Sequence, residues 1–168
     1  MGNVNGKIIH ISTDYVFDGT KSLPYDEEDT VSPIGVYGNT KREGELAVIN
    51  SPIDGIVIRT SWLYSAYGNN FVKTMMRLGK EKEKLNVIFD QIGTPTYACD
   101  LANSCLEILS NEQNQIDKAG KVYHFSNEGV VSWYDFALAI FEIKKNPCNV
   151  NPISTEQYPT PTKRPYYS

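Results

Sequence analysis

A tyrosine and a lysine four residues apart, Tyr37 and Lys41, are the side chains of this sequence best suited to proton transfer. On a helix, positions four apart lie on one face, so the phenol and the ammonium would point to the same place. A free phenol exchanges protons poorly at neutral pH, and a neighbouring cation favours its ionised form. The pair therefore predicts a general acid or base at Tyr37. Taken alone, the same spacing also fits an ordinary surface pair.

Two hydroxyl residues, Ser12 and Thr13, close an apolar run that has the character of a buried strand, residues 7–12. In an open parallel sheet, ligands bind at the carboxyl ends of the strands. A hydroxyl of Thr13 at that edge could hydrogen-bond a substrate carbonyl that Tyr37 also reaches. The alternative is a plain strand end, followed by a turn that Asp14 forms.

The elements that must position these residues follow from the apolar pattern, in which short strand-like runs alternate with longer helical ones. We expect strands over residues 7–12, 55–60, 85–89 and 121–126, and helices over residues 36–50, 70–82, 100–111 and 132–145. Ser132 and Asp135 have the spacing of a capping box for the last helix. From residue 147 onward, prolines predict an extended tail. The alternation indicates an α/β fold with a mainly parallel sheet. Residues 18–34 form a connection long enough to be functional.

Composition narrows the class of protein. The chain has 168 residues, of which 40% are hydrophobic and 21% charged, as in one soluble globular domain. With a net charge of −4, the chain lacks the excess of basic residues that is typical of a nucleic-acid binder. No apolar stretch approaches the roughly 20 residues of a membrane span, and no signal peptide is visible. We therefore expect a cytoplasmic protein without nucleic-acid or membrane partners. The three cysteines and two histidines lack the spacing of a metal site or a disulfide framework.

Five sequence blocks occur in a characteristic order along nearly the whole chain. They are ISTDYVFDG at residues 11–19, YGNTKREGE at 37–45, RTSWLY at 59–64, GNNF at 68–71 and DQIGTPT at 90–96. Together they resemble the dTDP-4-dehydrorhamnose reductase family of extended short-chain dehydrogenases and reductases. The resemblance implies NADPH-dependent reduction of the C4 ketone of dTDP-4-dehydro-L-rhamnose, the last step to the dTDP-L-rhamnose used for surface polysaccharides. Some members accept NADH, so that cofactor stays an alternative.

The resemblance also implies roles for individual residues. Thr13, Tyr37 and Lys41 would form the catalytic set: Tyr37 would protonate the C4 oxygen, Thr13 would polarise it, and Lys41 would hold the nicotinamide ribose. Ser12 and Thr60 would join Tyr37 and Lys41 in the cofactor site. The sugar nucleotide would contact Thr13, Asp14, Tyr15, Trp62, Asn70, Gln91, Thr96 and Arg164. Structural alternatives stay open for the last five: a core aromatic at Trp62, turn formers at Asn70, Gln91 and Thr96, and a solvated tail at Arg164.

The resemblance implies a partial Rossmann-type fold with a small C-terminal substrate-binding portion. Residues 1–66 and part of 115–145 would form the second half of the cofactor domain, and residues 67–112 and 146–168 the substrate portion. One departure is that no Gly-rich turn follows any expected strand, whereas the family binds the cofactor pyrophosphate at such a turn. We therefore expect a fragment that is doubtfully active alone, binds NADPH weakly and associates through the bared edge of its first strand. A homodimer and a Mg²⁺ ion at a subunit contact stay open.

Two other functions compete with this hypothesis. Another nucleotide-sugar reductase or epimerase would also keep Tyr37 and Lys41. A 4,6-dehydratase usually has Thr-Asp-Glu at the strand end, where this chain has Tyr15, and a phenol replaces a carboxylate poorly. A non-catalytic partner-binding subunit, such as the β-subunit of methionine adenosyltransferase, also resembles the family. Such a subunit has no reason to keep Thr13, Tyr37 and Lys41 together.

Overall fold

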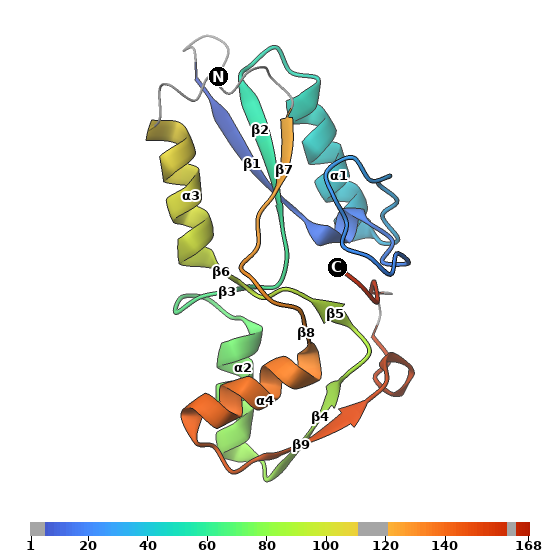
Figure 1. The fold of residues 1–168 in the computed structure, drawn as a ribbon, viewed down its shortest axis with the longest axis vertical. Helices are drawn as coiled ribbons and strands as arrows, with labels where there is room; N and C mark the ends of the chain where they lie inside the picture. Colours follow the sequence, from blue (N-terminus) through green and yellow to red (C-terminus); the bar gives the residue numbers. More distant parts are fainter. Residues whose placement is uncertain (1–5, 111–120, 161–163) are drawn as a thin grey trace.

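The computed structural model describes residues 6–110, 121–160 and 164–168. Its first layer is built around a parallel sheet of β1 (Ile8–Thr13), β2 (Gly55–Thr60) and β7 (Lys121–His124), in the order β1-β2-β7, and includes the helices that cover this sheet. Helix α1 (Val36–Ile49) lies on one side of this sheet and α3 (Ala98–Ser110) on the other (Figure 1). The arrangement confirms the expected α/β fold with a mainly parallel sheet.

Strand β2 explains why this sheet needs a helix on each side. All six of its residues are buried, as in parallel strands covered on both faces. Ile56 and Ile58 face α3 and pack near its residue Leu101. Arg59, pointing the opposite way, reaches Glu45 on α1. The alternation of side chains along one strand therefore joins both helices to the sheet.

A second layer lies below the first in Figure 1. Helices α2 (Phe71–Glu81) and α4 (Trp133–Lys144) pack against the parallel pair β4 (Lys84–Ile88) and β9 (Asn149–Ile153). Its core consists of Met75, Leu85, Val87, Ala137, Ile140, Phe141 and Cys148. The capping box at Ser132 is present as expected. Strand β9 is a correction, because the proline-rich tail was expected to be extended and loop-like, whereas β9 pairs with β4.

The two layers divide the helices differently from the expected domains. Helix α3 was assigned to the substrate portion, but its Leu101, Cys105 and Ile108 pack on the first sheet. Only part of residues 115–145 was assigned to the cofactor half, and the structure shows that α4, within that range, has Ile140 and Phe141 in the second core. An apolar stripe shows that a helix is buried, while only the folded chain decides against which sheet.

Short elements connect the layers. They are the parallel pair β3 (Leu63–Tyr64) and β6 (Thr96–Tyr97), the antiparallel pair β5 (Ile92–Gly93) and β8 (Val131–Ser132), and the 3₁₀ turns η2 (Asp14–Val16) and η3 (Thr155–Gln157). The C-terminal segment returns to this region, where Tyr167 bridges Ile92. Among the described residues, no helix has the length and apolar character needed to cross a membrane.

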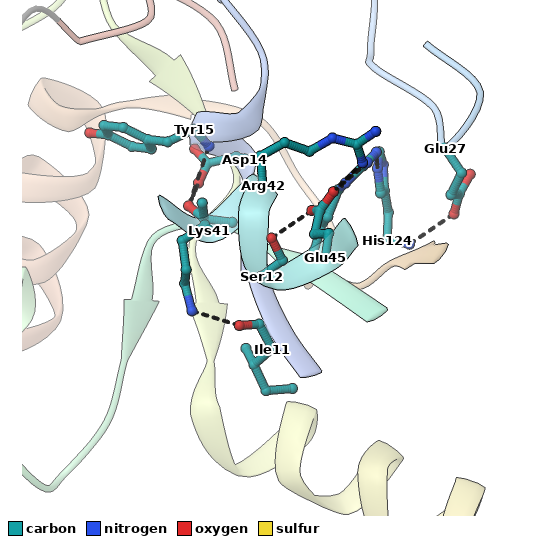
Figure 2. Close-up of polar contacts among 11 residues, drawn as sticks. Ile11, Ser12, Asp14, Tyr15, Glu27, Lys41, Arg42, Glu45 and His124 are labelled. Carbon is teal, nitrogen blue, oxygen red and sulfur yellow. Dashed lines mark hydrogen bonds and ion pairs between the residues drawn. The ribbon is translucent and has the colours of Figure 1, made fainter. Parts of the chain in front are cut away.

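The long connection over residues 18–34 is held against the sheet by several contacts. The ring of Tyr25 stacks on Phe17, with centroids 4.3 Å apart. Glu27 accepts a hydrogen bond from the backbone N–H of His124 on β7, at 2.8 Å (Figure 2). Lys21 pairs with Asp29 inside the connection. The segment therefore has a defined place beside the carboxyl ends of the strands.

Candidate active site

A cavity of about 570 Å³, hereafter the Tyr37 cavity, opens at the carboxyl ends of β1 and β2. This is the edge at which open parallel sheets bind ligands. Nine of the predicted site residues line it: Ser12, Thr13, Asp14, Tyr15, Tyr37, Lys41, Thr60, Trp62 and Arg164. The fold therefore gathers at one place residues that lie up to 152 positions apart in the sequence.

Tyr37 lies in the first turn of α1 and is 51% exposed. Its ring meets the ring of Tyr15 edge to face, with centroids 5.6 Å apart. The next residue, Gly38, allows this close approach, since a Cβ there would lie 2.2 Å from the backbone oxygen of Tyr15. The glycine thus brings the start of α1 against η2 and places the phenol at the cavity.

Lys41 lies one turn further along α1, as the spacing predicted. Its ammonium donates a hydrogen bond to the backbone oxygen of Ile11 on β1, at 2.7 Å (Figure 2). This bond fixes the cation over the end of the strand. An ammonium has three donors, so Lys41 can hold this bond and still bind a ligand in the cavity.

The Thr13 hydroxyl is engaged within its own turn. It donates to Oδ1 of Asp14 at 2.9 Å and accepts from the backbone N–H of Tyr15 at 3.3 Å, which caps η2. Thr13 is buried but lines the Tyr37 cavity. The hydroxyl is thus a turn-forming group on the wall of the Tyr37 cavity, and its hydrogen bond to a substrate carbonyl stays a prediction.

Asp14 occupies an unusual position for a carboxyl group. Its Oδ2 is buried and receives no hydrogen bond of ordinary geometry from the described residues. Burial raises the pKa of Asp14 to about 6, and nearby hydroxyls of Ser168 and Thr13 offset only part of this shift. Asp14 lines the Tyr37 cavity and also a second cavity of about 220 Å³. Burial, followed by the charge of Asp14, raises the pKa of Tyr15.

Trp62 forms an aromatic wall of the Tyr37 cavity. Its indole stacks on Trp133, with ring centroids 3.5 Å apart and planes 6° from parallel. Gly93 lies under the indole, where a Cβ would come within 2.7 Å of Trp62. The Trp62 backbone has a φ of 47°, a strained value for a bulky residue that is often found at ligand sites. Trp62 is thus packed against another aromatic ring and also faces the cavity.

Three predicted site residues do not line the Tyr37 cavity. Asn70 caps α2, its Oδ1 accepting from the backbone N–H of Lys73 and its Nδ2 donating to the backbone oxygen of Ser65. Gln91 is buried and donates to Thr155 at 3.1 Å. Thr96 is fully buried in β6. Asn70 and Gln91 use their side chains in structural hydrogen bonds, whereas Thr96 lies in a strand rather than a turn, and its Oγ1 is buried without a hydrogen-bond partner among the described residues. Contact of these three residues with the sugar nucleotide stays a prediction.

Arg164 lies at a boundary between two cavities. It lines the Tyr37 cavity and also an apolar one of about 400 Å³ between α2 and β4, hereafter the α2 cavity. Trp133 is shared by the same two cavities. The side chains of Phe71, Met75, Leu85 and Tyr158 form much of the remaining wall. The two cavities therefore adjoin and share Arg164 and Trp133 in their walls.

Sequence reasoning assigned no role to Glu45, which is fully buried beside the site. It accepts hydrogen bonds from Ser12 at 2.6 Å, from Nε and Nη2 of Arg59 at 2.9 Å each, and from Arg42 at 2.8 Å (Figure 2). Burial would raise the pKa of Glu45, but these bonds, led by those of Arg59, hold it below its ordinary value. The Ser12 hydroxyl, expected at the cofactor, is committed to this carboxylate.

Two signals in the sequence could have identified Glu45 and Arg59 as a buried ion pair. Glu45 follows Lys41 by four residues and Tyr37 by eight, so all three share one face of α1. Arg59 is a charged residue in the otherwise apolar run of β2, and such a residue needs a buried partner.

Known proteins resemble this chain both in sequence and in structure. A family model described as the RmlD substrate binding domain matches residues 2–168. A dTDP-4-dehydrorhamnose reductase of Aggregatibacter actinomycetemcomitans is 47% identical over 169 residues, covering 96% of this chain and 57% of that protein. The spore coat polysaccharide biosynthesis protein SpsK of Bacillus subtilis is 42% identical, covering 98% of this chain and 56% of that protein. The chain thus spans a little over half the length of these relatives.

Solved structures also superpose on this chain. The crystal structure of dTDP-4-dehydrorhamnose reductase from Bacillus anthracis in complex with NADP superposes with a TM-score of 0.91 at 44% identity, over 98% of this chain and 57% of that one. A dTDP-glucose 4,6-dehydratase from the same species, in complex with NAD, superposes with a TM-score of 0.77 at 16% identity, over 96% of this chain and 51% of that one. The second likeness concerns the fold alone.

Proposed function

Because this chain belongs to the RmlD substrate binding domain family, we propose that the protein reduces the C4 ketone of dTDP-4-dehydro-L-rhamnose to dTDP-L-rhamnose with NADPH. One observation carries the proposal: Thr13, Tyr37 and Lys41 line one cavity at the carboxyl ends of parallel strands. The names of the relatives supply the substrate. The NADP held by the Bacillus anthracis reductase in its crystal structure favours NADPH over NADH.

The residues present fit the nicotinamide end of such a cofactor. The Thr60 hydroxyl lines the Tyr37 cavity and is buried without a hydrogen-bond partner among the described residues. A buried polar group of this kind calls for a polar ligand. Lys41 and Thr60 would hold the ribose and the nicotinamide amide at this end. NADPH, when bound, supplies the hydride that the ketone carbon takes.

The chain's own residues then stabilise and protonate the ketone oxygen. That oxygen becomes basic as the carbonyl is reduced, and the Tyr37 phenol donates the proton to it. The Lys41 ammonium, fixed one turn away, offsets the negative charge left on the phenol. The Thr13 hydroxyl offers a second hydrogen bond to the same oxygen. Trp62 presents an aromatic surface beside which a sugar ring can lie.

The two adjoining cavities suit the two ends of a nucleotide sugar. The Tyr37 cavity would take the sugar and the apolar α2 cavity the base. Arg164 lies at their junction, where the diphosphate would pass. A guanidinium forms paired hydrogen bonds with phosphate oxygens, so it suits this place. Asn70, Gln91 and Thr96 line neither cavity, and this division of the ligand does not depend on them.

The proposed substrate also bears on the location and partners of the protein. Sugar nucleotides and NADPH are metabolites of the cytoplasm, where we place the reaction. The dTDP-sugar and the cofactor are the partners that this function requires, and it requires no nucleic acid. Neither Mg²⁺ nor a homodimer enters the chemistry derived from these residues.

Replacing Tyr37 by phenylalanine tests the proposal. In the full-length protein, we expect Tyr37→Phe to lower kcat by about 10²- to 10⁴-fold, since the proton donor is lost while the ring remains. NADPH consumption with the 4-keto sugar nucleotide measures the rate, and NMR of the product identifies the new C4 hydroxyl. Tyr67→Phe is a matched control, because Tyr67 is 86% exposed and lies outside the cavity. Full turnover by Tyr37→Phe would refute the proposal.

A further inference from the structure

The Thr13 hydroxyl has two candidate acceptors for a single proton. A hydroxyl carries one donor and two acceptor sites. One acceptor site already takes the backbone N–H of Tyr15, and the proton is donated to Oδ1 of Asp14 at 2.9 Å. In the proposed reaction the same proton must point to the ketone oxygen. Asp14 and the substrate therefore compete for it.

The outcome of this competition depends on the protonation of Asp14. An ionised carboxylate only accepts hydrogen bonds, whereas a protonated one has a donor of its own. Asp14 has few other hydrogen-bonding partners: its Oδ2 is buried, faces two cavities and has no hydrogen bond of ordinary geometry from the described residues, and the other hydroxyl near this carboxyl is that of Ser168. A proton on Asp14 could therefore be shared with Thr13.

We propose that Asp14 is a positioning residue that decides whether the Thr13 hydroxyl proton faces Asp14 or the substrate ketone. The proposal rests on the proposed function, because it assigns the Thr13 proton to that ketone. Neutral Asp14 donates its carboxyl O–H to Oγ1 of Thr13, and the threonine proton then points into the Tyr37 cavity. Ionised Asp14 accepts the threonine proton and withdraws it from the substrate.

Both forms of Asp14 are within reach near neutral pH. Burial raises the pKa of this carboxyl to about 6, compared with roughly 3.9 for an exposed aspartate. Neutral Asp14 therefore predominates below about pH 6 and ionised Asp14 above it. Polarisation of the ketone by Thr13 therefore weakens as pH rises through this range.

Other titratable and charged groups face Asp14 from the elements packed around it. Those on the side of the Tyr37 cavity are Tyr15, Tyr37, Lys41 and Arg164. Those on the side of the smaller cavity are Tyr25, Arg59, His124 and Tyr167. Among these, His124 is the group whose ordinary titration range lies near that of Asp14. Burial lowers the pKa of His124, with Glu27 opposing the shift, so the test must separate the two residues.

The pH profile of kcat/KM in the full-length protein provides the test. We expect the wild-type value to decline as pH rises through about 6 and then to level off at the lower rate of the ionised form, in which Tyr37 still donates its proton but Thr13 no longer polarises the ketone. Asp14→Asn should remove this decline, because an amide does not titrate, whereas a merely structural role would change the rate at every pH alike. Asp26→Asn is the matched control: Asp26 is an exposed carboxylate outside both cavities, and the decline should persist. An unchanged decline in Asp14→Asn would overturn the proposal.

A second pair of variants separates the alternatives. His124→Gln should keep the decline, and its loss there would assign the titration to His124 and overturn the proposal. In ¹³C NMR of the carboxyl carbon, Thr13→Val should raise the Asp14 pKa by removing a hydrogen bond to the carboxylate. An unshifted titration would show that the two groups are not coupled. This readout needs no turnover, so an inactive wild-type protein would refute the proposed function and leave the Thr13–Asp14 coupling to be judged separately.

Discussion

Single residues at this site are placed by what surrounds them rather than by their own preferences. Gly38 admits the backbone of Tyr15, which sets the phenol of Tyr37 at the cavity. Trp62 keeps a left-handed backbone while its indole lies on Trp133. Asp14 keeps a buried carboxyl oxygen without an ordinary hydrogen bond. Local strain and uncompensated burial of this kind lower the stability of the fold. Residues that carry such a cost are typically found at functional sites.

That cost can be measured at Asp14. Its pKa is raised from 3.8 unfolded to about 6 folded, so folding disfavours the charged form. Stability is highest below the unfolded value, falls as pH rises between 3.8 and about 6, and stays reduced above. We therefore expect Asp14→Asn to raise the free energy of unfolding at pH 7 by up to about 3 kcal/mol. Urea denaturation at pH 7 and pH 4 checks this, and a gain equal at both values would contradict it.

Among the elements, α1 has the largest part in building the site. It carries Tyr37 and Lys41 to the cavity and inserts Glu45 between itself and the sheet. The Glu45 carboxylate binds Ser12 of β1 and Arg59 of β2, so one side chain joins the helix to both strands. Since Ser12 precedes Thr13, this junction also fixes the strand end that lines the Tyr37 cavity.

Replacing Glu45 by glutamine should destabilise the protein by about 3–5 kcal/mol, because Arg59 would remain buried without its counter-charge. Thermal or urea unfolding measures the loss. Glu43→Gln on the exposed side of the same helix is the control and should stay within about 0.5 kcal/mol of wild type. The pKa of Glu45 is lowered by folding, so its contribution is complete above about 4.5 and is lost as pH falls below that value. Equal stability of the two variants would contradict the prediction.

At the scale of the whole molecule, the site lies between two layers with separate cores. The first sheet supplies Thr13 and Thr60, helix α1 supplies Tyr37 and Lys41, and Trp62 stacks on Trp133 of the second layer. Among the described residues, β1 pairs only with β2 and forms an edge of the sheet. The ligand would therefore be held from both layers, with the cofactor on the side of the first sheet.

Cofactor binding by the 168-residue chain alone tests this view of the molecule. We expect its affinity for NADPH to be far weaker than low micromolar, since the Tyr37 cavity offers donors to the nicotinamide end, while no Gly-rich turn follows an expected strand of this sequence to bind the pyrophosphate. Calorimetric titration measures the Kd, with a relative of full family length as the positive control. Low-micromolar binding by the chain alone would show that these residues suffice. Self-association through the β1 edge stays a prediction that sedimentation can address.

The sequence alone determined the local structure and the local chemistry. Alternating apolar runs predicted the main strands and helices, and the spacing of Tyr37 and Lys41 predicted a shared helical face. These features depend on residues a few positions apart, whose relation the backbone geometry fixes. The capping box at Ser132 was predicted for the same reason.

Only the tertiary structure decided which distant groups meet. Glu45 on α1 has its role because Ser12 and Arg59 arrive from two different strands, and Asp14 has its raised pKa because the C-terminal segment and the strand ends close around it. The same holds for α3 and α4, whose apolar stripes could have packed on either sheet. Spacing along the sequence indicates which face of an element is buried, but the distant group that this face meets is a property of the assembled chain.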